Sequence, residues 1–396
     1  NYTLYQRETM NQTFINSIHE HKNSIQELTT IYYDIEKQEQ LIWDELDNHH
    51  ITNYVSILEK TVAMSPHNIA IIEVATQQKY TYQMLEESSE KIANFIRHNI
   101  KESKIGLCYP NSFLFLATLI GINKTGRTAI LFNNREPLTQ LKTTAQTHHI
   151  TTSFGISIPS LVNYDIPTIL KKHIDVTQKN NCTTTLEDPA FIIFTSGTSG
   201  ASKAALFSHK RMIGAGVAWS IRTAMTQEDN CYITLPLYHG NALAVAFSSV
   251  LFTGATAVLR EKFSASHFFD DINQYQCSHM VYIGELWRYL INKTPSSTIP
   301  NKTLKVIFGN GLNHSLWSEV INRFNIQHVV EHFGATEMPA GALTNWTNNK
   351  GYCGFIPPTH KDSTRLQLIN QNGDEVQNSH SGEALFIVPT PPYRGY

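Results

Sequence analysis

The stretch Phe191-Ile-Ile-Phe-Thr-Ser-Gly-Thr-Ser-Gly-Ala-Ser-Lys-Ala-Ala-Leu-Phe-Ser208 decides the fold of this chain. It begins as an apolar strand, continues as a loop of Gly, Ser and Thr, and then passes through Lys203 into a second apolar run that ends at Ser208 before a helix. Glycines let successive backbone N–H groups face one anion, hydroxyl groups add donors, and Lys203 adds a positive charge. The stretch therefore predicts a phosphate-binding loop over residues 195–203.

This loop differs from a Walker A loop in two respects. A Walker A motif has Gly directly before the Lys, whereas Ser202 precedes Lys203 here. The residues after Lys203 are typical of a strand rather than of the helix that follows a Walker A loop. A flexible surface turn is the alternative interpretation, and the order Thr-Ser-Gly-Thr-Ser-Gly-x-x-Lys favours phosphate binding over it.

Short apolar runs alternate with amphipathic stretches on both sides of the loop, from about residue 51 onward. Strands that alternate with helices predict βα units and mostly parallel sheets. The expected strands are 68–74, 105–109, 129–132, 191–194, 232–235, 256–259, 280–283, 306–308 and 328–331. The expected helices include 81–96, 112–124, 266–275 and 315–324. We therefore expect an α/β fold of two packed α/β subdomains with mostly parallel sheets, over residues 51–350.

The two ends of the chain show other patterns. Residues 1–50 are polar with apolar residues at helical spacing over 14–46, which predicts a helical N-terminal extension that lies on a surface or on a partner. Beyond residue 351 the helical pattern stops. Strands are expected at 364–369 and 384–388, separated by the turn Asn370-Gln-Asn-Gly373, so residues 351–396 are predicted to begin a small β-rich, barrel-like unit.

Composition excludes several classes of protein. The formal net charge of −2 gives no sign of the clustered basic face of a nucleic-acid binder, so we expect no nucleic-acid partner. Five dispersed cysteines without a CxxC pair argue against a disulfide framework or a zinc site and favour a reducing, cytoplasmic compartment. The uncharged stretch 242–259 is divided by Gly254 and predicts a helix followed by a buried strand rather than a membrane span.

One motif competes with the phosphate loop. His328-Val-Val-Glu-His332 matches the H-x-x-E-H pattern of certain zinc proteases, which requires a helix. Val329 and Val330 favour a strand, in which residues i and i+4 lie about 13 Å apart. Two histidines at that separation do not share one metal ion, so we reject the zinc interpretation.

Three segments together resemble the adenylate-forming (AMP-binding) superfamily, which includes acyl-CoA synthetases, luciferases and peptide-synthetase adenylation domains. The loop 195–203 is similar to its phosphate-binding signature, and His332-Phe-Gly-Ala-Thr-Glu337 resembles its aromatic-Gly-x-Thr-Glu motif. Leu235-Pro-Leu-Tyr-His239 resembles the segment that carries its active-site histidine. Residues 263–271, 282–290 and 308–312 look like the fatty-acid-transport-protein / very-long-chain acyl-CoA synthetase branch, and the resemblance covers about 51–396.

The resemblance implies an activity and its cofactors. Such an enzyme activates a long-chain fatty acid with ATP to acyl-AMP, releases pyrophosphate and passes the acyl group to CoA, with Mg²⁺ as cofactor. The implied catalytic residues are His239, Lys203, Thr336 and Glu337. His239 would border the acyl carboxylate and the thiol route, and a purely structural histidine is the alternative.

The resemblance also implies a set of ligand-binding residues. The implied phosphate-binding residues are Thr195, Ser196, Gly197, Thr198, Ser199, Gly200 and Lys203. Gly309, Asn310 and Gly311 would form the adenine bed, and Phe333 would stack on adenine between His332 and Gly334. Thr336 would hydrogen-bond the phosphate or the carboxylate, and Glu337 would bind Mg²⁺ together with Thr198.

The chain departs from the family pattern at its end. After Gly382-Glu-Ala-Leu and Tyr393-Arg-Gly-Tyr396 the family continues to an Asp that binds ribose, a hinge and a C-terminal lid domain with a lysine used in adenylation. The lid domain is absent from this sequence, and its opening Asn and loop-like end favour a piece of a longer chain over a truncated homologue.

Two further functions stay open at this point. One is an acyl-AMP ligase that loads a carrier protein, and the other is a non-catalytic homologue that binds acyl ligand or nucleotide. Retention of Lys203, Thr336 and Glu337 argues against the second. The related branch handles insoluble acyl chains, so peripheral membrane contact through residues 1–50 is also considered.

Overall fold

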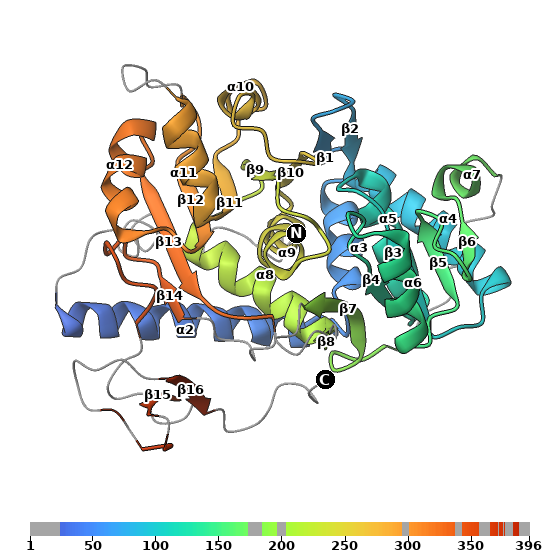
Figure 1. The fold of residues 1–396 in the computed structure, drawn as a ribbon, viewed down its shortest axis with the longest axis horizontal. Coiled ribbons are helices and arrows are strands. Elements are labelled where there is room, and N and C mark those ends of the chain that lie inside the picture. Colours follow the sequence, from blue (N-terminus) through green and yellow to red (C-terminus); the bar gives the residue numbers. More distant parts are fainter. Residues whose placement is uncertain are drawn as a thin grey trace.

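Two β-sheets with helices around them form the fold (Figure 1). The structure is a computed structural model that describes residues 24–172, 184–195, 203–294, 301–336, 343–355, 365–370, 372–374, 376 and 383–387. For 365–368 and 383–387 it describes the backbone alone. Both sheets are mostly parallel, which confirms the α/β prediction.

The larger sheet has eight strands in the order β14-β13-β12-β11-β9-β10-β1-β2. The six central strands run parallel, and the edge strands β2 and β14 are antiparallel to their neighbours. The strands are β1 (Ile69–Glu73), β2 (Lys79–Thr81), β9 (Asn230–Ile233), β10 (Thr256–Leu259), β11 (His279–Ile283), β12 (Val306–Asn310), β13 (His328–Phe333) and β14 (Leu343–Asn345).

The smaller sheet has six strands in the order β6-β5-β3-β4-β7-β8. Its strands are β3 (Lys104–Cys108), β4 (Thr128–Leu131), β5 (Thr152–Gly155), β6 (Val162–Tyr164), β7 (Pro189–Thr195) and β8 (Lys203–Ser208), and only β8 is antiparallel to its neighbour. The strand that the sequence predicts directly after Lys203 is therefore confirmed. Strands β2, β5, β6 and β14 were not predicted, because each has only three or four residues and too few apolar side chains to form a run.

The helices begin where the sequence places capping residues. Thr81, Ser112 and Ser208 each accept a hydrogen bond from a backbone N–H in the first turn of the helix that follows, which satisfies a donor that the helix leaves open. The helices are α2 (Ile25–Asn48), α3 (Val55–Met64), α4 (Tyr82–Asn99), α5 (Phe113–Asn123), α6 (Leu138–Thr147), α7 (Ile166–Lys171), α8 (His209–Thr223), α9 (Ser248–Thr253), α10 (Phe268–Gln274), α11 (Gly284–Lys293) and α12 (His314–Phe324).

Two expectations about ambiguous stretches are confirmed. The uncharged stretch 242–259 forms the π-helix η1 (Asn241–Phe247), then α9, and then the buried strand β10, with Gly254 in a left-handed conformation at φ 73°. The stretch 328–332 lies in strand β13, so the helix that a zinc-protease motif requires is absent there. In the described part of the chain, none of the helices combines the length and the apolar character needed to cross a membrane.

Near the end of the chain, β15 (Arg365–Ile369) and β16 (Glu383–Ile387) pair antiparallel, with Arg365 opposite Ile387. The two strands expected there are confirmed. They form a sheet of their own rather than an edge of either larger sheet.

One apolar core joins the two large sheets, and it includes Leu107 of β3 and Ile71 of β1. Asn111, just after β3, fastens the smaller sheet to two loops of the larger one. Its amide group donates to the carbonyl oxygens of Leu235 at 2.8 Å and Arg260 at 3.3 Å, and its Oδ1 accepts from Leu237 N at 2.8 Å. These bonds fix the segment that leads to His239.

Helix α2 covers one side of α8, and Figure 1 shows it running horizontally beneath α8. Its buried side chains are spaced at four, seven and four residues, which gives one apolar face. They are Ile31, Ile35, Ile42 and Leu46. Glu39 forms an ion pair with Arg222 of α8, and the Tyr32 and Trp346 ring centroids are 5.8 Å apart. The apolar face that the sequence predicts for this segment therefore packs against the rest of the chain.

We expect Ile35→Ala to lower the free energy of unfolding by about 2–5 kcal/mol, because it leaves a cavity between α2 and α8. Leu41→Ala on the same helix is the matched control, because Leu41 is 44% exposed. Denaturant unfolding of both variants measures the difference. Equal losses in the two variants would contradict the docked position of α2.

Candidate functional site

The predicted site residues lie at the carboxyl ends of parallel strands. His239 follows β9, Gly309 and Asn310 end β12, Phe333 ends β13, and Thr195 ends β7. In open α/β sheets ligands bind at this edge, outside the carboxyl ends of the strands. Segments far apart in the sequence therefore gather on one side of the molecule.

The hairpin β7–β8 carries the predicted phosphate loop. Thr195 pairs with Lys203 across the antiparallel ladder, so the two ends of the loop lie side by side. Lys203 is exposed at the start of β8. The loop residues between them, including Ser196, Gly197, Thr198, Ser199 and Gly200, lie outside the described residues.

The turn after β12 contains the predicted adenine bed. Gly311 adopts a φ of 83°, a conformation that favours glycine. Gly284, the first residue of α11, leaves room for this turn, because a Cβ there would lie 1.6 Å from the Gly311 carbonyl oxygen. Asn241 of η1 donates to Asn310 Oδ1 at 2.6 Å, which ties the turn to the segment that carries His239.

The buried side chain of Glu331 stabilises this turn. Glu331 accepts hydrogen bonds from the backbone N–H groups of Gly311 and Leu312, the latter at 3.1 Å, and from the hydroxyl of Tyr282. Burial raises the pKa of the Glu331 carboxyl above its usual value, and these hydrogen bonds oppose that shift. Sequence reasoning considered Glu331 only within the H-x-x-E-H pattern and missed this role. The signal was an acidic residue inside an otherwise buried strand.

Neighbouring residues of β13 lie on opposite faces of the sheet. Phe333 is 44% exposed, so its ring is open to a ligand. His332 is buried on the other face, where its ring centroid is 4.8 Å from that of Trp219 on α8. Burial lowers the pKa of His332 to about 4, although a hydrogen bond to the Gly309 backbone acts in the opposite direction. The two residues that were predicted to bind the nucleotide therefore have different surroundings. The Phe333 ring is open to a ligand, whereas the His332 ring is buried.

Gly334 and Thr336 follow β13 in the predicted motif. The guanidinium of Arg211, in the first turn of α8, donates from Nη2 to the Thr336 carbonyl oxygen at 2.8 Å. Because α8 directly follows β8, this bond places the motif beside the hairpin of the phosphate loop. Glu337 lies outside the described residues, as does Thr198, so the predicted Mg²⁺ ligands have no described geometry.

His239 lies just before the first turn of η1. Its backbone N–H donates to the Pro236 carbonyl oxygen at 3.0 Å, and its ring centroid is 4.7 Å from that of Tyr238. Desolvation by the surrounding protein lowers the pKa of His239 below its usual value, and the positive charge of Arg135 lowers it further. The imidazole is therefore neutral near pH 7. Short π-helices such as η1 are often found at functional sites.

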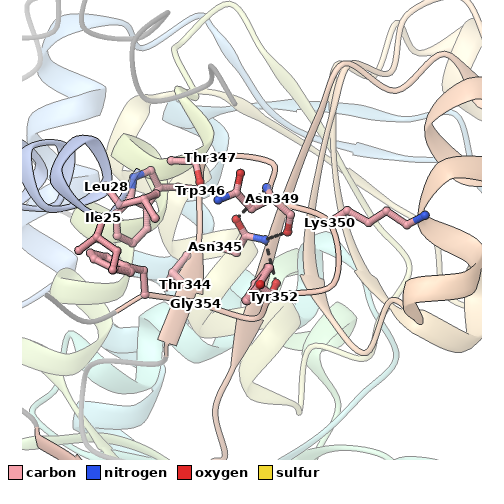
Figure 2. A pocket seen from close by; sticks show the side chains of 11 residues that line it. Ile25, Leu28, Thr344, Asn345, Trp346, Thr347, Asn349, Lys350, Tyr352 and Gly354 are labelled. Atoms are coloured by element: carbon pink, nitrogen blue, oxygen red, sulfur yellow. Dashed lines mark hydrogen bonds between the residues drawn. The ribbon is translucent and has the colours of Figure 1, made fainter. Parts of the chain in front are cut away.

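Among the described residues no group of three or more His, Cys, Asp or Glu side chains is arranged to hold a metal ion. A separate pocket of 460 Å³ lies between the first turn of α2 and the segment after β14 (Figure 2). The amide of Asn345 donates there to the carbonyl oxygens of Asn349 at 2.5 Å and Tyr352 at 2.8 Å. None of the predicted site residues lines this pocket.

Residues 58–390 match the family model described as AMP-binding enzyme. Human long-chain fatty acid transport protein 1 is 27% identical over 361 residues, which cover 84% of this chain and 56% of that protein. The medium/long-chain-fatty-acid–CoA ligase FadD6 of Mycobacterium tuberculosis is 43% identical over 152 residues, covering 38% of this chain and 26% of FadD6. The chain thus spans a little over half the length of the fatty acid transport protein.

Solved structures share the fold. The N-terminal domain of FACL13 from M. tuberculosis, solved with an inhibitor, has a TM-score of 0.73 at 17% identity, covering 85% of this chain and 89% of that one. ATP-bound MatB from Rhodopseudomonas palustris has a TM-score of 0.74 at 17% identity, covering 85% of this chain and 70% of that one.

The buried imidazole of His332 predicts a pH-dependent stability. Its pKa is about 4 in the folded chain and near 6.5 when unfolded, so the unfolded state binds the proton first as pH falls. The free energy of unfolding is therefore expected to decrease between about pH 6.5 and pH 4. In His332→Phe, which keeps a ring against Trp219, the decrease should be smaller.

Denaturant unfolding across this pH range checks the prediction. His67→Phe is the control, because His67 is exposed in a turn, and it should leave the pH dependence unchanged. A slope for His332→Phe equal to that of the unaltered chain would show that the imidazole does not titrate as described.

Proposed function

The chain belongs to the AMP-binding enzyme family, and we propose that the protein it represents activates a long-chain fatty acid with ATP. The reaction forms acyl-AMP and pyrophosphate, and the acyl group then passes to the thiol of CoA. The observation that carries this proposal is the hydrogen bond from Arg211 to Thr336. It brings the phosphate-loop hairpin and the aromatic-Gly-x-Thr-Glu segment together at the edge where Gly309–Gly311 also lie.

The described residues fit a bound nucleotide. Phe333 offers a flat, open apolar face for the adenine ring, and in the Gly309–Gly311 turn the one side chain, that of Asn310, is held by Asn241. Lys203 stands at the end of a Gly- and Ser-rich loop, where a cation and backbone N–H groups stabilise phosphate oxygens. We propose ATP as the ligand of this site.

Mg²⁺ is proposed to bind Glu337 and Thr198, whose oxygen atoms are the ligand type that Mg²⁺ prefers. Bound there, the ion would neutralise phosphate charge that develops during adenylation. Thr336 would hydrogen-bond the phosphate or the carboxylate. His239, neutral near pH 7, would border the acyl carboxylate and offer an imidazole that carries no added charge.

CoA is proposed as the acceptor because the relative FadD6 is named a fatty-acid–CoA ligase. A carrier protein is the alternative acceptor, and acceptor assays with CoA and with an acyl carrier protein separate the two. A non-catalytic nucleotide-binding or acyl-binding role would show as ATP or fatty-acid binding without exchange.

The domain organisation also remains a proposal. We assign residues 1–50 to a helical extension, 51–350 to the AMP-binding body and 351–396 to the start of a β-rich, barrel-like unit whose described residues include β15 and β16.

Helix α2 buries its apolar face within the chain, so it does not support the membrane contact considered for residues 1–50. Residues 1–23 lie outside the described residues. We propose a cytoplasmic location.

We expect the full-length protein to catalyse ATP–pyrophosphate exchange that depends on a long-chain fatty acid. Lys203→Met and Glu337→Gln should each lower the exchange rate by about 100-fold or more, because the first removes a positive charge that stabilises phosphate oxygens and the second removes the carboxylate proposed to bind Mg²⁺. Lys210→Met is the matched control, because Lys210 is an exposed lysine of the same segment that pairs with Glu187. Absence of exchange with every fatty acid tested would refute the proposal.

A further inference from the structure

Arg211 joins three segments of the chain. Its Nη2 donates to the Thr336 carbonyl oxygen at 2.8 Å, and its Nη1 to that of Leu206 in β8 at 3.4 Å. Its guanidinium lies 3.7 Å from the ring centroid of Phe207, also in β8. Thr336 is 125 residues away along the chain, so this one side chain spans the two predicted phosphate-handling segments.

The location of Arg211 is electrostatically unfavourable for the helix itself. Arg211 is in the first turn of α8, where its backbone N–H donates to the cap residue Ser208 at 3.2 Å. The amino end of a helix carries partial positive charge and disfavours cations. Arg222, in the last turn of the same helix, has the favourable location and forms an ion pair with Glu39. A cation is therefore present where helix stability alone would favour an anion or a neutral side chain.

We infer that Arg211 is a positioning residue for the proposed adenylation reaction, holding the backbone of Thr336 against β8, the strand that begins at Lys203. The inference rests on the proposed function. A guanidinium suits this task because it is planar, stacks on an aromatic ring and offers donors in fixed directions. A lysine ammonium at the same position would keep the charge but lose the planar group that stacks on Phe207 while bonding to two carbonyl oxygens.

The consequence for catalysis follows from what Arg211 contacts. Arg211 donates to the backbone of Thr336 and to the strand that begins at Lys203, whereas the proposed adenine contacts lie at Gly309–Gly311 and Phe333. Loss of Arg211 would leave the adenine contacts in place and misplace the groups that act on the phosphates. The defect should therefore appear mainly in kcat, with a smaller change in the KM for ATP.

The test is ATP–pyrophosphate exchange by the full-length protein with oleate. Arg211→Met should lower kcat by about 30-fold or more and change the KM for ATP by about threefold or less, and Arg211→Lys should recover part of the loss. Arg222→Met is the matched control, because it removes the same group from the other end of α8. It should lower the thermal unfolding midpoint as Arg211→Met does and keep kcat within about threefold of the unaltered protein.

A kcat for Arg211→Met within about threefold of the unaltered protein would overturn the inference, as would an equal loss in Arg222→Met or a loss that appears mainly in KM. If Arg211→Met does not fold, Arg211→Lys carries the test, and its exchange activity equal to that of the unaltered protein overturns the inference. Absence of exchange by the unaltered protein refutes the proposed function instead, so the two failures are distinguishable.

Discussion

The hydrogen bonds of Asn111 are the constraint on which the geometry of the site depends. Its amide contacts the backbone of two loops that leave neighbouring strands β9 and β10 of the larger sheet, while Asn111 itself follows β3 of the smaller sheet. A partly buried amide that donates and accepts in this way is costly to displace, because the backbone groups it serves would lose their partners. The segment that ends in His239 is therefore fixed relative to the sheet that carries the phosphate-loop hairpin.

The same principle holds at the other two turns of the site. Glu331 fixes the turn after β12 through the N–H groups of Gly311 and Leu312, and Arg211 fixes the carbonyl group of Thr336. In each case a polar side chain from one segment fixes the backbone of another segment of the chain. Main-chain groups that are held in this way can present N–H donors to a ligand without reorganising, which is the basis of electrostatic stabilisation by a preorganised site.

This arrangement explains which parts of the site could be predicted from the sequence. The loop 195–203 and the strands around it follow from local composition, because glycine, hydroxyl and apolar residues show their tendency within a few positions. Asn111 and Glu331 were not assigned these roles because their partners lie 126 and 20 residues away. Locally, Asn111 resembles a helix-capping residue, and the position of Glu331 inside a buried strand does not indicate which backbone groups it serves. Strands β5 and β6 were missed for a related reason, since pairing of β5 with β3 and of β6 with β5, rather than apolar length, stabilises them. The side of β13 on which His332 lies depended on the register of the sheet, which the motif alone does not give.

The charge state of the site follows from the same geometry. Burial lowers the pKa of His332 to about 4, and the pKa of His239 lies below its usual value, so both imidazoles are neutral near pH 7. Positive charge beside the hairpin is carried by Lys203 and Arg211. Stabilisation of phosphate charge at this site then depends on where β8 and α8 hold those two cations rather than on the titration of a histidine. For that reason the contact between Arg211, at the amino end of α8, and Thr336 bears directly on the chemistry proposed here.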